Sequence, residues 1–222
     1  MNVPDPGRNK KEIDAGAGAV RRQYASQAAE YERRWQSYLR ATIEPTLSAL
    51  AARSGERILD LGCGTGLLLR ELGEATIGTV ACGVDLSVDM LQVALEHSSV
   101  LRLAAADAHH LPFQHAAFDA VVSSSSMHHW ARPDEVLTEI ARILRPGGRL
   151  VVTDWADDFL MTRALSLVLR VTDRSHMRTY DAENTCAMIE NAGFRVVRCQ
   201  LYKEGWKWGF MTISAELPMG TR

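Results

Sequence analysis

Asp60 and three glycines that follow it have the types and the spacing of a ligand-binding turn. Asp60 lies in the apolar segment 57–61, which runs into Gly62, Gly64 and Gly66 at every second position. Glycine accepts positive φ angles and has no Cβ, so a ligand can lie against the backbone there. A carboxylate beside such a turn indicates a nucleoside site at the carboxyl edge of an α/β sheet. Tight strand-to-helix turns also need glycine for steric reasons alone, and this alternative stays open for the motif by itself.

The spacing of the glycines disfavours two familiar nucleotide sites. The turn has no Gly-Lys-Ser/Thr sequence, which the phosphate-binding loop of nucleotide hydrolases requires. A dinucleotide-binding turn would place its third glycine three residues after the second, where Leu67 stands.

Two further acids end the next apolar segments. Asp85 lies twenty-five residues after Asp60, and its carboxylate could accept both hydroxyls of a ribose. Asp85 could instead only cap the helix that begins near Ser87. Asp107 ends the third segment, where its carboxylate could accept from an adenine amino group while Ala108 offers a backbone amide to the ring.

The elements that must position these acids alternate between strand and helix. Apolar segments and amphipathic segments follow one another from residue 57 to 154, a pattern that requires a parallel sheet covered on both faces. The segments 194–201 and 207–215 are joined by a short connection, which favours an antiparallel pair at the sheet edge. The predicted fold class is therefore α/β, with a doubly wound and mostly parallel sheet.

The flanking segments have their own patterns. The composition of residues 1–18 predicts a flexible tail, and we expect residues 19–222 to form one domain. Within 19–53 the spacing of aromatic residues is helical, so this segment either packs on the sheet or forms a lid over a bound cofactor. Pro45 should break or restart that helix. Residues 155–180 form a helical insert that we expect over the substrate pocket.

The composition limits the class of protein. The chain has 222 residues, a hydrophobic content of 46% and a formal net charge of −2, which are values typical of one globular domain without global attraction to nucleic acid. Its four cysteines show no metal-ligand spacing, so we expect buried thiols and no metal site. No leader or membrane span is evident, and we expect a cytoplasmic protein.

Seven motifs occur in a fixed order between residues 58 and 154. They are Leu59–Gly66, Val84–Ser87, Asp107–Ala108, Leu111–Phe113, Phe118–Asp119, His128–Trp130 and Leu144–Gly148. The ordered set resembles the class I (Rossmann-like) S-adenosylmethionine-dependent methyltransferases, and within them the small-molecule group called type 11. The resemblance implies S-adenosylmethionine as cofactor and a seven-stranded sheet whose last strand is inserted antiparallel.

The resemblance also implies roles for the residues of the glycine turn and the second strand. Gly62 and Gly64 would let the backbone approach the methionine part of the cofactor, with Asp60 nearby. Asp85 would bind the ribose, and Leu86 would lie against the adenine.

Further implied contacts come from the third and fourth strands and from the amino-terminal segment. Asp107 and Ala108 would contact the adenine edge, while Ser123 and the residues just after it would line the sulfonium end. A helix closes over the cofactor in related enzymes, and this implies three candidates for cofactor contacts. They are Tyr24, Tyr31 and Arg34.

Methyl transfer from a sulfonium needs little from side chains beyond alignment of the acceptor and exclusion of water. A base is useful for a hydroxyl or amine acceptor, and His128 is the best candidate by position and titration range. His128 could equally be a packing residue in a turn below the pocket, and His176 is a weaker candidate. The predicted partner is a small-molecule methyl acceptor, with the oligomeric state left open.

Two other functions remain compatible with the sequence. One is a different group transfer from a modified S-adenosylmethionine, and the other is a module that binds the cofactor or its demethylated product without catalysis. Turnover with an acceptor distinguishes a methyltransferase from such a module.

Overall fold

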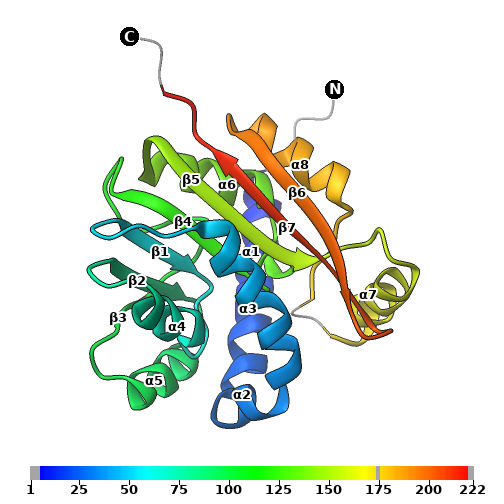
Figure 1. Ribbon diagram of the computed structural model, residues 1–222. Coiled ribbons are helices and arrows are strands. Elements are labelled where there is room, and N and C mark those ends of the chain that lie inside the picture. The colour runs from blue at the N-terminus through cyan, green and yellow to red at the C-terminus, as the bar shows by residue number, and fades with distance from the viewer. Residues whose placement is uncertain (1–5, 174–175, 220–222) are drawn as a thin grey trace.

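A seven-stranded sheet forms the centre of the computed structural model, which describes residues 6–173 and 176–219 (Figure 1). The strands are β1 (Arg57–Leu61), β2 (Val80–Asp85), β3 (Arg102–Ala105), β4 (Phe118–Ser124), β5 (Leu144–Trp155), β6 (Arg195–Glu204) and β7 (Trp208–Glu216). The longer helices are α1 (Pro6–Ala25), α3 (Gln36–Leu50), α4 (Leu67–Ala75), α5 (Val88–His97), α6 (Pro133–Ile143), α7 (Leu160–Thr172) and α8 (Ala182–Asn191). The short turns of helix are η1 (Ala28–Glu30), α2 (Tyr31–Arg34) and η2 (Met127–His129).

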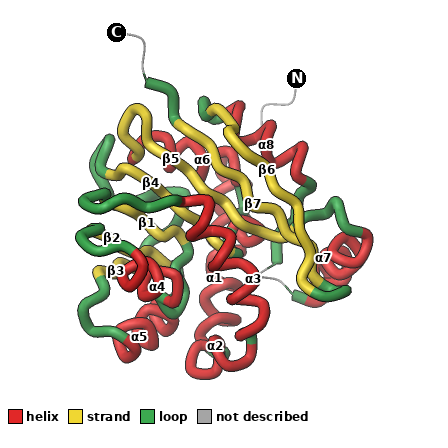
Figure 2. The backbone as a smooth tube through the Cα atoms, viewed as in Figure 1, coloured by secondary structure: helices red, strands yellow, loops and turns green. Residues whose placement is uncertain are grey.

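The strands lie in the order β3-β2-β1-β4-β5-β7-β6. The first five are parallel, and β7 lies antiparallel between β5 and β6. Helices cover both faces of the sheet (Figure 2). The predicted α/β fold, with a doubly wound, mostly parallel sheet and an antiparallel edge hairpin, is confirmed. Because parallel strands end at one edge, Asp60 and Asp85 meet there.

The central strand β1 shows how the sheet separates two cores. Ile58 packs in a cluster with α3 and α4, whereas Leu59 and Leu61 pack in a cluster with α6 and α8. All three side chains are fully buried, which explains why the segment is continuously apolar. Asp60 shares the side of Ile58, since side chains alternate along a strand.

The amino-terminal segment differs from the expectation. α1 begins at Pro6, so residues 6–18 are helical where the sequence predicted a flexible tail over 1–18. Residues 1–5 lie outside the described part of the chain. Two contacts with residues distant in the sequence, Asp173 and Met177, hold α1 in place. A Cβ on Gly16 would lie 2.8 Å from the Met177 methyl group, and Gln23 Nε2 donates to Asp173 Oδ2 at 2.7 Å.

Pro45 does not break its helix, contrary to the prediction. α3 continues through Pro45 to Leu50, and the helical segment is interrupted earlier, between Ala25 and Gln36. Proline leaves the carbonyl four residues before it without its usual donor. The Tyr202 hydroxyl of β6 donates to that carbonyl, Ala41 O, at 3.1 Å. A tertiary hydrogen bond therefore replaces the missing helical one.

The four cysteines are free, but they are not uniformly buried as expected. Cys63 is buried, Cys82 and Cys186 are partly exposed, and Cys199 is exposed. Cys199 belongs to β6, and the side chains of this edge strand are largely exposed.

Tyr202→Phe should lower the free energy of unfolding by about 1–2 kcal/mol, because the Ala41 carbonyl loses its donor. In a Pro45→Ala background the same change should cost less, because alanine restores the helical N–H at that position. Urea unfolding of the unaltered chain, the two single variants and the double variant measures the coupling between Tyr202 and Pro45. Equal costs in both backgrounds would show that the two groups do not substitute for one another.

Candidate active site

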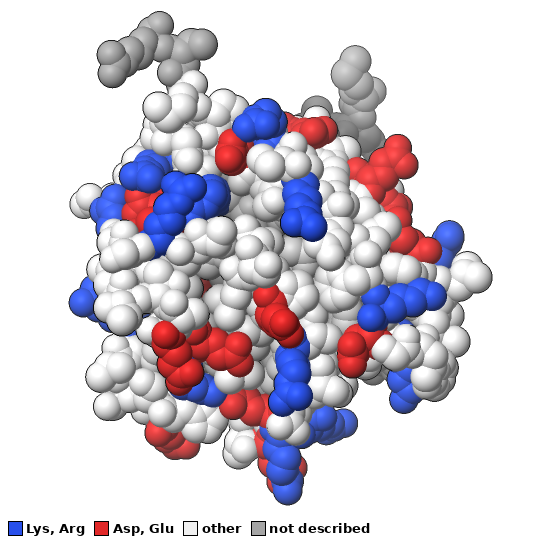
Figure 3. Space-filling model, viewed as in Figure 1, with Lys and Arg blue, Asp and Glu red and all other residues white. Residues whose placement is uncertain are grey.

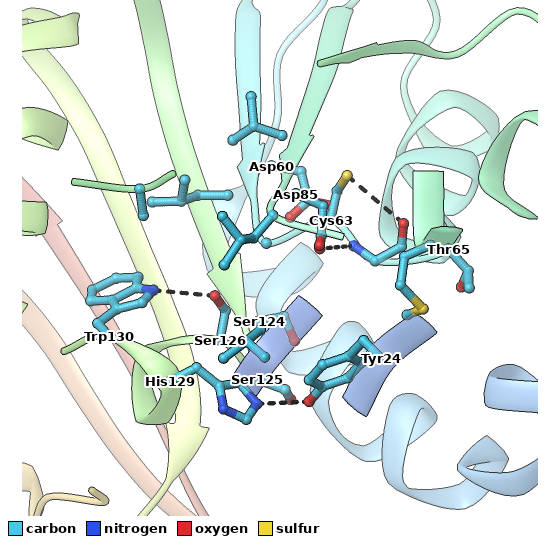
Figure 4. A pocket seen from close by; sticks show the side chains of 18 of the residues that line it. Tyr24, Asp60, Cys63, Thr65, Asp85, Ser124, Ser125, Ser126, His129 and Trp130 are labelled. Carbon is cyan, nitrogen blue, oxygen red and sulfur yellow. Dashed lines mark hydrogen bonds between the residues drawn. The ribbon is translucent and has the colours of Figure 1, made fainter. Parts of the chain in front are cut away.

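A cavity lies beyond the carboxyl ends of β1, β2 and β4 and beneath the amino-terminal helices (Figure 4). The empty space inside it, with open solvent included, is about 1090 Å³. Its wall combines the acids of the strand ends, the glycine turn, β4 exit residues and apolar lid residues. The predicted residues in this wall are Tyr24, Tyr31, Asp60, Gly62, Gly64, Asp85, Leu86, Asp107 and Ala108.

The glycine turn lies directly against the exit of β4. Gly62 has a φ of +79°, and a Cβ there would clash with Ser126 Oγ. Gly64 has a φ of +53°, and its amide donates to Asp85 Oδ2 at 2.8 Å. The other oxygen of Asp85 accepts from the Ser87 amide at 2.8 Å. Asp85 thus fixes the turn and the start of α5 at once, and its carboxylate, with two acceptor oxygens in the cavity wall, can accept further hydrogen bonds.

Asp60 is a buried acid on the cavity floor. Its side chain is 2% exposed, and among the described residues Oδ2 has no hydrogen-bond partner. Burial, assisted by the negative charge of Asp85, raises the pKa of Asp60 to about 8. A buried carboxyl group with one unpartnered oxygen suits a cationic ligand group, because the positive charge of the ligand would favour the ionised form of the carboxyl group.

Asp107 is held by a nearby histidine, His109. His109 is buried, and its backbone amide and Nδ1 both lie within hydrogen-bond distance of Asp107 Oδ1, at 2.9 and 2.6 Å. His109 Nε2 accepts from the Arg132 amide at 3.3 Å, so Nδ1 carries the proton. The hydrogen bond from His109 lowers the pKa of Asp107 against the effect of burial. The second oxygen of an ionised Asp107 remains for a ligand donor.

A charged clasp joins the amino-terminal lid to the glycine turn. Glu32 in α2 accepts from Arg70 Nη2 at 2.8 and 2.9 Å and from the Thr65 hydroxyl at 2.7 Å. Arg70 Nη1 also donates to the Thr65 carbonyl at 2.8 Å. Burial opposes ionisation of Glu32, but Arg70 and Thr65 hold its pKa below the ordinary value. The lid is therefore fastened to the turn that faces the cavity.

The far side of the cavity carries a tyrosine and a histidine that point toward one another (Figure 4). Tyr24 Oη in α1 lies 2.7 Å from His129 Nε2, and the rings meet edge to face. Burial raises the pKa of Tyr24 well above its ordinary value, so the phenol stays neutral. Trp130 Nε1 donates to Ser126 Oγ at 3.2 Å beside this pair.

His128, the predicted base, is not among the residues of the cavity wall. Its Nδ1 lies 2.7 Å from Asp154 Oδ1, and its ring stacks on Trp155 with centroids 5.1 Å apart. Burial opposes ionisation of Asp154, but the charge and hydrogen bonds of His128 hold its pKa below the ordinary value. His176 packs 5.4 Å from the His128 ring, also behind the wall.

The structure places three other predicted residues or segments outside the cavity wall. Ser123 is fully buried and donates to the Leu61 carbonyl at 3.0 Å, whereas the residues just after it, which the same prediction included, line the cavity as Ser124, Ser125 and Ser126. Arg34 is exposed, with its guanidinium 5.6 Å above the Trp35 ring, because it lies on the outer side of the short helix α2. No described residue of the insert 155–180 lines the cavity. The insert instead supports α1 from outside through Asp173 and Met177.

Comparison with known proteins places the chain in a family. A family model described as a methyltransferase domain matches residues 59–152. A demethylmenaquinone methyltransferase of Beutenbergia cavernae is 40% identical over 173 residues, which are 73% of this chain and 70% of the relative. One of Mycobacterium marinum is 34% identical over 182 residues, or 75% of each chain. The chain belongs to the class I S-adenosylmethionine-dependent methyltransferases. The match to another relative, an uncharacterized 37.1 kDa protein of Streptomyces fradiae, covers 41% of the length of that protein.

A solved structure has the same fold as the methyltransferase. A putative methyltransferase of Haloferax volcanii, in complex with the Trm112 methyltransferase activator, aligns with a TM-score of 0.78 at 21% identity. The alignment covers 88% of this chain and 97% of the Haloferax chain. At 21% sequence identity this similarity shows only that the two chains have the same fold.

The cofactor of the methyltransferase is S-adenosylmethionine, and its cavity fits that molecule. The unpartnered oxygen of Asp60 suits a positive charge, the carboxylate of Asp85 suits hydroxyl donors, and Gly62 and Gly64 bring backbone without a Cβ to the cavity wall. Within the described ranges no helix has the length and apolarity to cross a bilayer. The same residues contain no group of three or more potential metal ligands.

Three residues of the site were missed or undervalued in the sequence. His109 follows Asp107 by two positions, a spacing that could have indicated a local hydrogen bond. His129 was passed over for its neighbour because adjacent histidines give no sign of which one faces a pocket. Glu32 pairs with Arg70 across 38 residues, and no local pattern predicts such a contact.

Glu32→Gln should raise the Kd for S-adenosylhomocysteine about fivefold and speed its dissociation, because the lid loses its charged clasp. Calorimetry and stopped-flow dissociation provide the two measurements. Glu30→Gln is the matched control, since the Glu30–Arg33 pair lies in solvent on the same lid. An unchanged dissociation rate in Glu32→Gln would show that the clasp does not limit opening.

Proposed function

We propose that the chain methylates a small aromatic acceptor with a hydroxyl group, of the quinol type. The observation that carries the proposal is the far side of the cavity, where the polar pair Tyr24 and His129 lies beside the serines 124–126 and shares the cavity with an apolar wall. The apolar wall comes from the lid helices. Its residues are Ala17, Val20, Leu39 and Ile43. An aromatic ring with one hydroxyl group matches this combination.

The names of the relatives support the same acceptor class. Two of them, at 40% and 34% identity, are called demethylmenaquinone methyltransferases, and the reduced form of such a quinone is an aromatic diol. We extend methylation of an aromatic diol to this chain because Tyr24 and His129 can form hydrogen bonds with one hydroxyl group of such an acceptor.

We assign the cofactor contacts as follows. The amino-acid end of the methionine part lies along Gly62 and Gly64, and Asp60 neutralises its ammonium group. Asp85 accepts from the ribose hydroxyls, and Leu86 packs against the adenine. Asp107 and Ala108 bind the adenine edge. The support for these roles is that all these residues line one continuous cavity.

When bound, S-adenosylmethionine supplies a methyl group on a sulfonium that is a good leaving group. The task of the protein is to hold the acceptor in line with the S–CH₃ bond and to exclude water. The acceptor ring carbon would form the new C–C bond as the S–CH₃ bond breaks and S-adenosylhomocysteine leaves. That ring carbon would then lose its hydrogen as a proton and the acceptor oxygen would regain one, so that the ring is aromatic again and one proton is released in total. His129 takes the hydroxyl proton of the acceptor, directly or through the Tyr24 hydroxyl, which increases the electron density of the ring.

The proposal is tested by incubating the full chain with S-adenosylmethionine and a reduced demethylnaphthoquinone with a short prenyl tail. S-adenosylhomocysteine and a product heavier by one CH₂ unit should form in equal amounts, as measured by mass spectrometry. Turnover of amine or carboxylate acceptors without turnover of the quinol would overturn the assignment.

Cofactor binding should release protons at neutral pH. Free Asp60 has a raised pKa of about 8, so it is largely protonated at pH 7, whereas a bound ammonium group favours its carboxylate. The bound state therefore holds fewer protons, and affinity for S-adenosylhomocysteine should rise from pH 6 to pH 8. Calorimetry in buffers of different ionisation enthalpy counts the released protons. Asp60→Asn should abolish most of the release; equal release by both proteins would exclude Asp60 as its source.

His129→Ala should lower kcat about a hundredfold, with a much smaller change in cofactor affinity, because the proton acceptor is removed. Tyr24→Phe should also lower kcat, but by a smaller factor. His128→Gln is the control at the neighbouring position. It should lower the melting temperature, since His128 pairs with buried Asp154, and should change kcat less than His129→Ala does. A larger loss of kcat in His128→Gln than in His129→Ala would reverse the assignment.

A further inference from the structure

The helix α7 buries two hydroxyl side chains and exposes a row of apolar ones, while Leu165 and Leu169 pack inward against the core. Thr162 and Ser166 face the protein with exposed fractions of 0% and 4%, while Leu160 and Val171 are 85% and 86% exposed. The buried hydroxyls are satisfied: Thr162 accepts from the Gly209 amide at 2.9 Å, and Ser166 lies 2.6 Å from the Thr179 hydroxyl. The inward side is thus fixed by specific hydrogen bonds, and the outward side lacks a partner among the described residues.

The outward apolar residues form one continuous stripe over the length of α7. Leu167 and Val168 are 58% and 57% exposed, and Met161 is 45% exposed. With Leu160 and Val171 they follow the three- and four-residue spacing that places side chains on one helix face. The segment 160–172 contains no Asp or Glu. A contiguous apolar surface of this kind marks an interaction site rather than scattered surface residues.

Basic and aromatic residues of the β6–β7 hairpin lie beside the stripe. Lys203 Nζ lies 5.1 Å from the ring centre of Phe159, the residue immediately before α7. At the hairpin tip Trp206 is 70% exposed, with Lys207 Nζ 5.4 Å from its ring centre. Figure 1 shows α7 at this end of the hairpin, and Figure 3 shows largely uncharged surface at the same place with basic side chains beside it.

We propose that α7 and the β6–β7 hairpin tip dock on the surface of an anionic lipid bilayer. An amphipathic helix with an outward apolar face, an exposed tryptophan and flanking lysines is the combination that binds the boundary of headgroups and acyl chains. The two lysines complement negative headgroups, which a second apolar protein surface would not need. The acids at the base of α7 are engaged inward, since Asp158 Oδ2 accepts from the Ala182 amide and Asp157 pairs with Thr179. Glu204 is the remaining acid of the hairpin end.

The docking surface is connected to the lid of the active site. Asp173 at the end of α7 accepts from Gln23 in α1, and Met177 packs on Gly16 of the same helix. Tyr24 of α1 lines the cavity. A bilayer beneath α7 would therefore lie next to the helix that closes the acceptor site, which suits an acceptor with a lipid tail. That advantage rests on the proposed function, whereas the docking itself does not.

Co-sedimentation of the full chain with vesicles tests the proposal without any acceptor. Vesicles of mixed phosphatidylglycerol and phosphatidylcholine should bind the protein, and vesicles of phosphatidylcholine alone should bind it weakly. Leu167→Gln/Val171→Gln should raise the apparent Kd for the mixed vesicles at least about tenfold. Lys207→Gln should raise it about fivefold, and added salt should reduce that difference.

Ile77→Gln/Val100→Gln is the matched control, because these residues are 87% and 84% exposed in loops away from α7. It should bind vesicles like the unaltered chain, and all variants should keep their affinity for S-adenosylhomocysteine. Absence of vesicle binding, or equal losses in the control, would overturn the proposal. A dimer in analytical ultracentrifugation that the stripe variant dissociates would also overturn it, by assigning the face to a second copy.

Discussion

Two carboxyl groups, the buried Asp60 and the half-buried Asp85, lie close together at the ends of neighbouring strands and set the character of this site. Asp85 is satisfied, because the amides of Gly64 and Ser87 each donate to one of its oxygens. Asp60 lies one strand away, and the nearby Asp85 charge together with burial disfavours its ionised form. The fold thus holds an acid whose charge is costly until a cation arrives. In the proposed binding mode, a sulfonium nucleoside with an ammonium group relieves that cost, so the site is organised in advance for its cofactor.

The glycine turn transmits this organisation to the lid. Asp85 holds the turn from the sheet side through the Gly64 amide, and Glu32 holds it from the lid side through Thr65. The turn can take both partners because its backbone adopts positive φ angles that other residues would resist. Opening of the lid must therefore break the Glu32 clasp at the turn itself. Cofactor exchange and lid position are coupled through one short loop.

The sequence predicted the sheet well because strand periodicity and the acids at strand ends are local signals. Asp60, Asp85 and Asp107 appear in the cavity wall for that reason. The start of α1 was misjudged because contacts such as Gln23 with Asp173 join segments 150 residues apart. Pro45 was misjudged for the same reason, since its helix survives through a hydrogen bond from another element. Long-range partners of this kind leave no trace in local composition.

The exchange of roles between two adjacent histidines follows from a buried charge. Asp154 is 2% exposed in the core and needs a partner, and the His128 amide and Nδ1 both approach its carboxylate. The turn at 127–129 is a 3₁₀ helix, in which successive side chains point about 120° apart. Once His128 is turned inward to Asp154, His129 is directed to the cavity and Tyr24. The core thus selects which histidine can serve the reaction, and the pair His128–His129 divides into one structural and one cavity-facing residue.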